Sequence, residues 1–171
     1  MTTVTIPELR TDRLILRAPA MADFDAYAAM MASDRAAYMG QLSRRHAWYS
    51  FTNDVATWLL HGWGIWSVDL RQGTHIGQVG AQLPDPFPEP ELGWFLHPGH
   101  EGHGFATEAA LVALGWLRGR MDSLVSYIDP ANARSIALAG RLGAVRDKDA
   151  PLPEGETSAE THVFRHWGVA P

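Results

Sequence analysis

The segment of this chain best suited to chemistry is a glycine-rich run between an expected strand and an expected helix. Gly99, Gly102 and Gly104 lie close together, just before an apolar helical pattern that begins near Phe105. Glycine lets a backbone turn sharply and approach a ligand without a Cβ in the way. The free amides and the positive dipole end of a helix start suit an anionic group such as a pyrophosphate. We therefore expect segment 102–107 to bind a phosphate-bearing ligand.

Three other interpretations of this segment compete with that one. The plainest is a glycine-rich turn that binds no ligand. A dinucleotide-binding fingerprint needs a third glycine where the chain has Thr107. A nicotinamide-linked oxidoreductase would also need an acidic ribose-binding residue after a second strand, and we find no convincing candidate. A Walker loop is excluded because no Gly-Lys-Ser/Thr follows the glycines.

Three histidines of the same region, His97, His100 and His103, recur at every third position, which raises the question of a metal site. Neither a cysteine nor a carboxylate cluster accompanies them, and a glycine-rich loop does not preset tetrahedral ligand geometry. We therefore expect these histidines to lie beside solvent or phosphate, and we expect no metal cofactor.

The composition narrows the remaining function classes. The 171 residues fit a single domain, 1–171, and an apolar content of 46% excludes a disordered or fibrous chain. The net charge of -5 provides no electrostatic footprint for nucleic acid. The chain has no cysteine, which excludes disulfides, thiolate metal sites and a cysteine nucleophile. No apolar stretch has the length of a signal peptide or a membrane span, so we expect a cytoplasmic protein without nucleic-acid or membrane partners.

Hydrophobic periodicity and turn residues define the elements that must position these groups. Strands are expected over 13–17, 64–69, 75–81, 91–96, 124–128 and 161–167. Helices are expected over 24–31 (with Asp23 as its N-cap), 43–60, 105–120 and 133–142. The apolar residues expected on or near one face of the second helix are Trp48, Phe51, Val55, Trp58 and Leu59. Together these elements predict an α+β sheet with helices on its faces.

Several segments match a known family in its order and spacing. Glu101-x-x-Gly104-x-Ala106 resembles a pyrophosphate loop usually written Gln/Arg-x-x-Gly-x-Gly/Ala. The other matching segments are 9–17, 76–80, 91–94 and 129–135, the last followed by Leu142-Gly143-Ala144. The chain thus resembles the GNAT (Gcn5-related) N-acetyltransferase superfamily, in the branch that includes ribosomal-protein N-terminal acetyltransferases. Glu101 departs from the family pattern, and because a carboxylate near a pyrophosphate costs Coulomb energy, we expect its side chain to point to solvent.

The resemblance implies a GNAT-like fold, a mixed and mostly antiparallel splayed sheet flanked by helices. In such folds strand 91–96 parts from strand 124–128, and the pantetheine of the co-substrate acetyl-CoA lies in the gap. An amide-bearing arm can complete a ladder there, as a peptide does in strand addition. The residues implied to bind acetyl-CoA are Phe95, Leu96, His97, Gly102, His103, Gly104, Phe105, Ala106, Thr107 and Asn132.

The implied chemistry is direct attack of an amine on a thioester. An amine at neutral pH is mostly protonated and must first lose a proton. The resemblance places a base or a water-holding carboxylate at Glu91 and a proton donor for the departing thiolate at Ser135. Each has a plainer alternative: Glu91 as an ordinary strand-end carboxylate, Ser135 as a helix cap, and Asn132 as a support for the Asp129-Pro130 turn. Glu108 is expected to be structural, favouring the helix N-terminus by its charge.

The implied activity is an acetyl-CoA-dependent N-acetyltransferase whose acceptor is a primary amine, on a protein N-terminus or a small molecule. The alternative is an acyl-CoA-binding module with weak or no turnover, for which Glu101 is the best argument. The tryptophans Trp63, Trp66 and Trp94 are expected mainly in the core, although some could wall an acceptor pocket. The many apolar residues, and the pairing habit of similar enzymes, also favour a homodimer.

Overall fold

The strands of the computed structural model, which describes residues 4–85 and 87–168, form one eight-stranded sheet in the order β1-β2-β3-β4-β5-β6-β8-β7. Neighbouring strands pair antiparallel, apart from β5 and β6, which run parallel. The strands are β1 (Leu9–Arg10), β2 (Leu14–Arg17), β3 (Ile65–Leu70), β4 (His75–Gln82), β5 (Glu91–Leu96), β6 (Leu124–Ile128), β7 (Val145–Arg146) and β8 (His162–Trp167). The predicted fold class, a mixed and mostly antiparallel sheet flanked by helices, is therefore confirmed.

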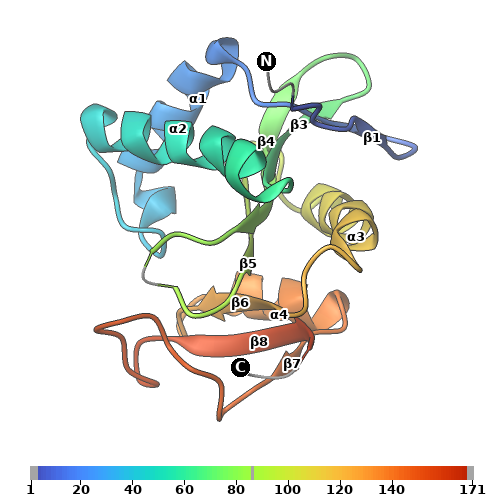
Figure 1. Ribbon diagram of the computed structural model, residues 1–171. Coiled ribbons are helices and arrows are strands. Elements are labelled where there is room, and N and C mark those ends of the chain that lie inside the picture. The colour runs from blue at the N-terminus through green and yellow to red at the C-terminus, as the bar shows by residue number, and fades with distance from the viewer. Residues whose placement is uncertain (1–3, 86, 169–171) are drawn as a thin grey trace.

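The helices are α1 (Phe24–Ala32), α2 (Arg44–His61), α3 (Phe105–Leu117) and α4 (Ala133–Arg141), with short 3-10 turns at Met21–Asp23 and Asp34–Ala36. Helices α1 and α2 lie on one side of the sheet and α3 lies on the other, while α4 packs beside β6 (Figure 1). The predicted elements are all present, but α3 ends at Leu117 rather than at Arg120. No helix within the described ranges is long and apolar enough to cross a membrane.

The main core lies between α3 and the strands β2 to β5. Small side chains on α3, Ala109, Ala110 and Ala113, are fully buried and let the helix approach the sheet closely. At the edge of this core, Trp66 of β3 packs edge-on against Trp58 of α2 at 4.7 Å and against Trp116 of α3 at 5.3 Å, measured between ring centroids. These tryptophans tie α2, the sheet and α3 together.

The buried face of α2 differs from the predicted one. Phe51 and Trp58 are buried as expected, but Trp48 and Leu59 are 40% and 61% exposed, and Val55 is exposed as well. The buried stripe instead continues through Asp54, which lies three residues after Phe51 and four before Trp58. That spacing follows the 3.6-residue helical period, whereas the predicted set extends too far around the helix.

Asp23 occupies the predicted N-cap position of α1, but its side chain does not cap the helix. The carboxylate of Asp23 makes no cap hydrogen bond to α1 and instead accepts hydrogen bonds from Arg17 at 2.7 and 2.8 Å and from the Ser67 hydroxyl at 2.7 Å. Burial raises the pKa of Asp23, but the hydrogen bonds from Arg17, Ala20 and Ser67 outweigh it and lower this pKa to about 2. Asp23 therefore fastens α1 to the sheet as part of a buried ion pair.

The sheet is splayed between β5 and β6. The two strands share one register pair, Glu91 with Val125, supported by a hydrogen bond from Val125 N to Pro90 O at 3.0 Å. Beyond this point β5 continues to pair with β4, and β6 with β8, so the parallel strands separate. The division that the resemblance implied between strands 91–96 and 124–128 is thus present.

A buried ion-pair cluster locks the joined end of the gap. Arg165 of β8 donates two hydrogen bonds to Glu89, at 2.7 and 2.9 Å, and a third to Asp147 at 2.6 Å. Glu89 precedes β5 and is 1% exposed, so the pair is shielded from solvent. This cluster connects the half-sheet of β1 to β5 with the half-sheet of β6 to β8.

Candidate active site

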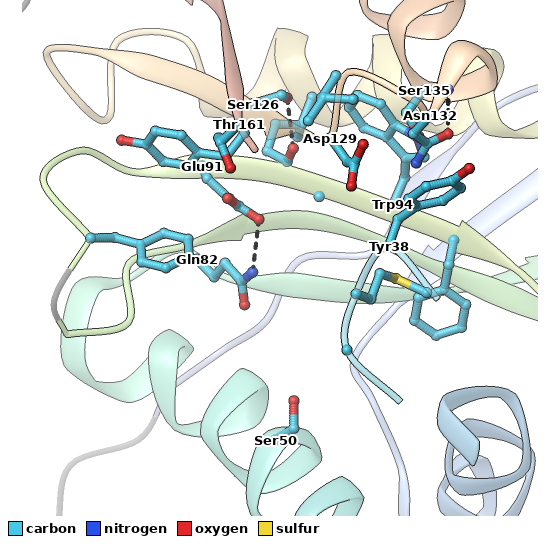
Figure 2. Close-up of a pocket in the computed structure, with 18 of the residues that line it drawn as sticks. Tyr38, Ser50, Gln82, Glu91, Trp94, Ser126, Asp129, Asn132, Ser135 and Thr161 are labelled. Atoms are coloured by element: carbon cyan, nitrogen blue, oxygen red, sulfur yellow. Dashed lines mark hydrogen bonds between the residues drawn. The ribbon is translucent and has the colours of Figure 1, made fainter. Parts of the chain in front are cut away.

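A cavity of about 610 Å³ opens where β5 and β6 part. One wall is β5 from Glu91 to Phe95, and the facing wall is the end of β6 with the turn that leads into α4. Residues of α1, α2 and the loop before β8 close the remaining sides. Figure 2 shows the labelled side chains converging from these elements on a common space.

Glu91 lies at the joined end of the gap and faces the cavity (Figure 2). Gln82 of β4 donates a hydrogen bond to its Oε1 at 3.0 Å. Burial, with a smaller contribution from Glu156, raises the pKa of Glu91 to about 7, even though the Gln82 hydrogen bond opposes this shift. Gly93 leaves space beside the carboxylate, because a Cβ there would lie 3.7 Å from Oε1. A carboxyl group with this pKa can both accept and release a proton near neutral pH.

The open edge of β5 presents alternate backbone groups to the gap. The Ser126 hydroxyl on β6 donates to Leu92 O at 2.7 Å, so the Leu92 carbonyl group points toward β6 and the gap. Because every second residue of a strand points its backbone groups to the same side, the amides of Trp94 and Leu96 also face the gap. The amide of His97 instead donates to Ile76 O on β4 at 2.8 Å.

The side chains at the end of β5 occupy different places. The ring of Phe95 lines the cavity, and so does Trp94, whereas Trp63 and Trp66 belong to the core. The ring of His97 is buried 5.0 Å from that of His75, and burial lowers the pKa of His97 to about 4. Of the residues predicted to pair with pantetheine, Leu96 thus offers its backbone to the gap and Phe95 its side chain.

The glycine-rich loop has the backbone geometry that its sequence predicted. Gly99, Gly102 and Gly104 adopt positive φ angles of 88°, 78° and 79°, which side chains disfavour. The first hydrogen bond of α3 runs from Glu108 N to Gly104 O at 3.0 Å. The amides of residues 105–107 therefore precede the helical ladder and are oriented for an anion.

Arginines from several elements surround this loop. Arg13 donates to the His103 carbonyl at 2.9 Å, and Arg141 donates to the Thr107 hydroxyl at 3.4 Å. Arg35 forms an ion pair with Glu101, and the charge of Arg134 also acts on that carboxylate. We call Arg13, Arg35, Arg134 and Arg141 the arginine collar. Because Arg13 pairs with Glu108 and Arg35 with Glu101, the net positive charge of the collar comes from Arg134 and Arg141. This charge suits the same anion as the free helix amides.

The expectation that Glu101 points to solvent is wrong. Its carboxylate accepts a hydrogen bond from Gly99 N at 2.9 Å and pairs with Arg35. Burial raises the pKa of Glu101, but backbone hydrogen bonds and Arg35 outweigh it, and the pKa falls below its usual range. Because Arg35 neutralises the carboxylate locally, Glu101 braces the loop without leaving a free negative charge beside it.

Asn132 and Ser135 lie across the gap from β5 (Figure 2). The Asn132 side chain is the N-cap of α4 and accepts a hydrogen bond from Ser135 N at 3.1 Å. Ser135 therefore does not serve as the cap, and its residue lines the cavity. Tyr38 reaches the same turn, where its hydroxyl donates to Ala131 O at 3.4 Å.

The cavity residues that were not predicted include Asp54 and Tyr127. Asp54 of α2 is only 4% exposed, and burial raises its pKa to about 8. One sequence signal could have identified Asp54: it is a carboxylate at helical spacing between Phe51 and Trp58, where it interrupts an apolar stripe. Tyr127 of β6 has a buried hydroxyl with no hydrogen-bond partner among residues 4–85 and 87–168, and no sequence pattern marked it.

The other candidate residues are dispersed. His103 lies against the ring of Phe105, at 5.6 Å between centroids, and away from the buried His97. In the described part of the chain, no three His, Cys, Asp or Glu side chains gather as metal ligands. Glu108 pairs with Arg13 and accepts a hydrogen bond from Thr11, so it links α3 to the turn before β2.

Comparison with known proteins places this geometry in context. Residues 13–145 match the family model described as an acetyltransferase (GNAT) domain. An acetyltransferase from Agrobacterium tumefaciens is 41% identical, with a TM-score of 0.88 over 96% of both chains. The ribosomal L7/L12 α-N-protein acetyltransferase RimL, solved with CoA, shares the fold at 15% identity, with a TM-score of 0.66 over 91% of this chain and 92% of that one. The uncharacterized protein YkkB of Bacillus subtilis is 32% identical over 89 residues, which are 48% of this chain and about half (51%) of that relative.

Proposed function

Because this chain belongs to the GNAT acetyltransferase family, we propose that it transfers the acetyl group of acetyl-CoA to a primary amine. The observation that carries this proposal is the Glu91 carboxyl group, which lies in the β5–β6 cavity with a pKa raised to about 7. A group of this kind can deprotonate an ammonium ion at the pH of a cell. The proposal therefore assigns Glu91 as the general base, acting directly or through water.

The binding of acetyl-CoA is proposed on the fit of the chain's own residues. The free amides of 105–107 and the arginine collar supply hydrogen bonds and positive charge for the diphosphate. The Trp94 and Leu96 amides at the open edge of β5 supply strand-like partners for the pantetheine amides. RimL, which shares the fold, was solved with CoA, and this supports the same class of ligand here.

The proposed reaction balances with the groups present. Glu91 takes one proton from the ammonium group of the acceptor, and the freed nitrogen lone pair forms a C–N bond with the thioester carbon. The C–S bond breaks, and the sulfur receives a proton through Ser135 as the second amine proton leaves the nitrogen. Ser135 then recovers its proton from the nitrogen or from water, and Glu91 releases its proton to solvent. The products are an N-acetyl amide, free CoA and one proton.

A thiol-release assay with a panel of primary amines, run beside calorimetry with acetyl-CoA, tests this proposal. We expect micromolar-scale binding of acetyl-CoA, about the usual range for enzyme substrates, and amine-dependent release of thiol. Binding without thiol release for any amine or N-terminal peptide would instead support the alternative, an acyl-CoA-binding module. The pairing of Glu101 with Arg35 weakens the sequence argument for that alternative.

We also propose that the chain forms a homodimer in the cytoplasm. The supporting observation is the exposed apolar surface of α2, which includes Trp48, Tyr49, Leu59 and Leu60. Exposed apolar groups of this size commonly mark a protein interface. Light scattering at micromolar concentration should report twice the chain mass of 18.8 kDa. A mass equal to one chain would contradict the dimer.

A further inference from the structure

The charged residues in the described lining of the cavity are all acidic. The acidic side chains that line it are Asp54, Glu91, Asp129, Glu156 and Glu160. Lysine, arginine and histidine are absent from the described residues of its lining. A single ammonium group beside Glu91 would leave the other four carboxyl groups of this lining without a cationic partner. The cavity therefore suits an acceptor with more than one positive charge.

The buried carboxyl group of Asp54 indicates a second cation site in the cavity. It is 4% exposed, and burial is the sole cause of its raised pKa, so no cationic or hydrogen-bonding side chain of the described chain compensates it. A buried carboxyl group without a partner lowers stability, and such a cost is typical of a binding site. The neighbouring turn of α2 supplies Ser50, whose hydroxyl points toward the cavity in Figure 2 and accepts a hydrogen bond from Tyr27 at 2.8 Å.

The cavity lining also contains apolar residues against which an alkyl chain could pack. Asp54 comes from α2 and Glu91 from β5, and both line the one cavity. The apolar residues Ile65 and Phe95 contribute to the same lining. A flexible methylene chain can lie along such walls while each of its ends meets a carboxyl group.

We propose that Asp54 binds the second ammonium group of a small aliphatic di- or polyamine, whose other nitrogen is acetylated beside Glu91. This inference rests on the proposed acetyltransferase function and names the substrate class of its site. An ammonium ion at Asp54 would ionise the carboxyl group and pair with it in a desolvated place, where such a pair discriminates strongly against neutral groups.

The test compares 1,4-diaminobutane with 1-aminopentane, which replaces one amino group by a methyl group of similar size. In the native protein, kcat/KM for the diamine should exceed that for the monoamine by about tenfold or more. Asp54→Asn should bring this ratio close to one, mainly by raising KM for the diamine. Asp122→Asn makes the same substitution in an exposed turn outside the cavity and should leave the ratio unchanged.

Calorimetry with 1,4-diaminobutane, in the presence of CoA, separates this inference from the proposed function. Diamine binding that is weakened about tenfold or more by Asp54→Asn, without thiol release from acetyl-CoA, would support the cation site and refute the transfer reaction. Equal kcat/KM for diamine and monoamine, unchanged by Asp54→Asn, would overturn the cation site and keep the reaction. Acetylation of N-terminal peptides alone, with diamines neither bound nor acetylated, would also overturn the cation site.

Discussion

Glu91 combines a position at the joined end of the β5–β6 gap with a pKa near neutrality. If it is the base, Glu91→Gln should lower turnover by about two orders of magnitude, the usual scale for a general base. Turnover of the native protein should rise with pH through about 7, because the carboxylate is the active form, and the variant should lose this rise. Stopped-flow thiol release from pH 5 to 9 measures both effects. Native-like turnover of the variant across this range would place the base elsewhere.

Ser135 and Asn132 offer a matched pair that separates catalysis from helix capping. Since the Asn132 side chain caps α4, Ser135→Ala should keep the melting temperature but slow acetyl transfer by removing a hydrogen-bond donor near the sulfur. Asn132→Ala should lower the stability by about 1 kcal/mol through loss of the cap. Thermal denaturation and single-turnover rates distinguish these results. An intact rate per folded molecule in Ser135→Ala would remove the serine from the proposed mechanism.

At the scale of an element, α3 depends on glycine at both of its ends. Gly104 precedes the helix at a φ of 79°, and Gly119 follows it at a φ of 81°. Gly104→Val should weaken acetyl-CoA binding by about tenfold or more, because it reshapes the amides offered to the diphosphate. Gly119→Val imposes similar backbone strain away from the loop and should reduce stability without affecting affinity. Calorimetry on both variants provides the comparison, and equal acetyl-CoA affinities would contradict the assigned phosphate loop.

The elements were predictable wherever their causes are local in sequence. Strand alternation, helical periodicity and the glycines before α3 identified the sheet, the helices and the loop. The two-residue strands β1 and β7 are too short for any periodicity to mark them. The role of the Asp23 side chain was mispredicted because its partner Ser67 lies 44 positions away, and that of Glu101 because Arg35 comes from a distant turn. Both errors reflect tertiary contacts that outweigh the local preference.

The site follows the same division between local and distant causes. Glu91 and the phosphate loop lie in short motifs, so the sequence marked them directly. Asp54 belongs to the site because α2 turns one face toward a cavity that exists only after the sheet has splayed. An alternating or helical pattern identifies a buried position, but it does not say whether packing atoms or a cavity lie opposite. The sequence therefore predicted the place of Glu91 in the cavity more readily than that of Asp54.

At the scale of the molecule, the Arg165 cluster holds the two half-sheets together. Glu89→Gln removes the charge of a partner that is 1% exposed, and we expect a loss of about 3 kcal/mol in the free energy of unfolding. Burial alone raises the pKa of Glu89, yet hydrogen bonds from Arg165 lower it on balance. Its stabilisation is thus present above the unfolded-state pKa and lost as pH falls through the folded-state pKa.

Denaturant unfolding at pH 7 and at acidic pH measures this contribution. The matched control is Glu8→Gln, which breaks an ion pair between Glu8 and Arg10 that is roughly half exposed on both sides. Surface pairs of this kind contribute little, so the control should change stability by less than about 1 kcal/mol. Equal effects of the two substitutions would show that the cluster does not fasten the half-sheets.

The acidic lining of the cavity affects the release of the product in the proposed reaction. Acetylation converts an ammonium ion into a neutral amide, so the reacting end of the acceptor loses the charge by which the carboxylates attracted it. Attraction to the cavity is then weaker for the acetylated molecule than for its precursor, without any movement of the chain. In the proposed reaction we therefore expect the amide product to bind more weakly than the amine and to inhibit turnover little as it accumulates.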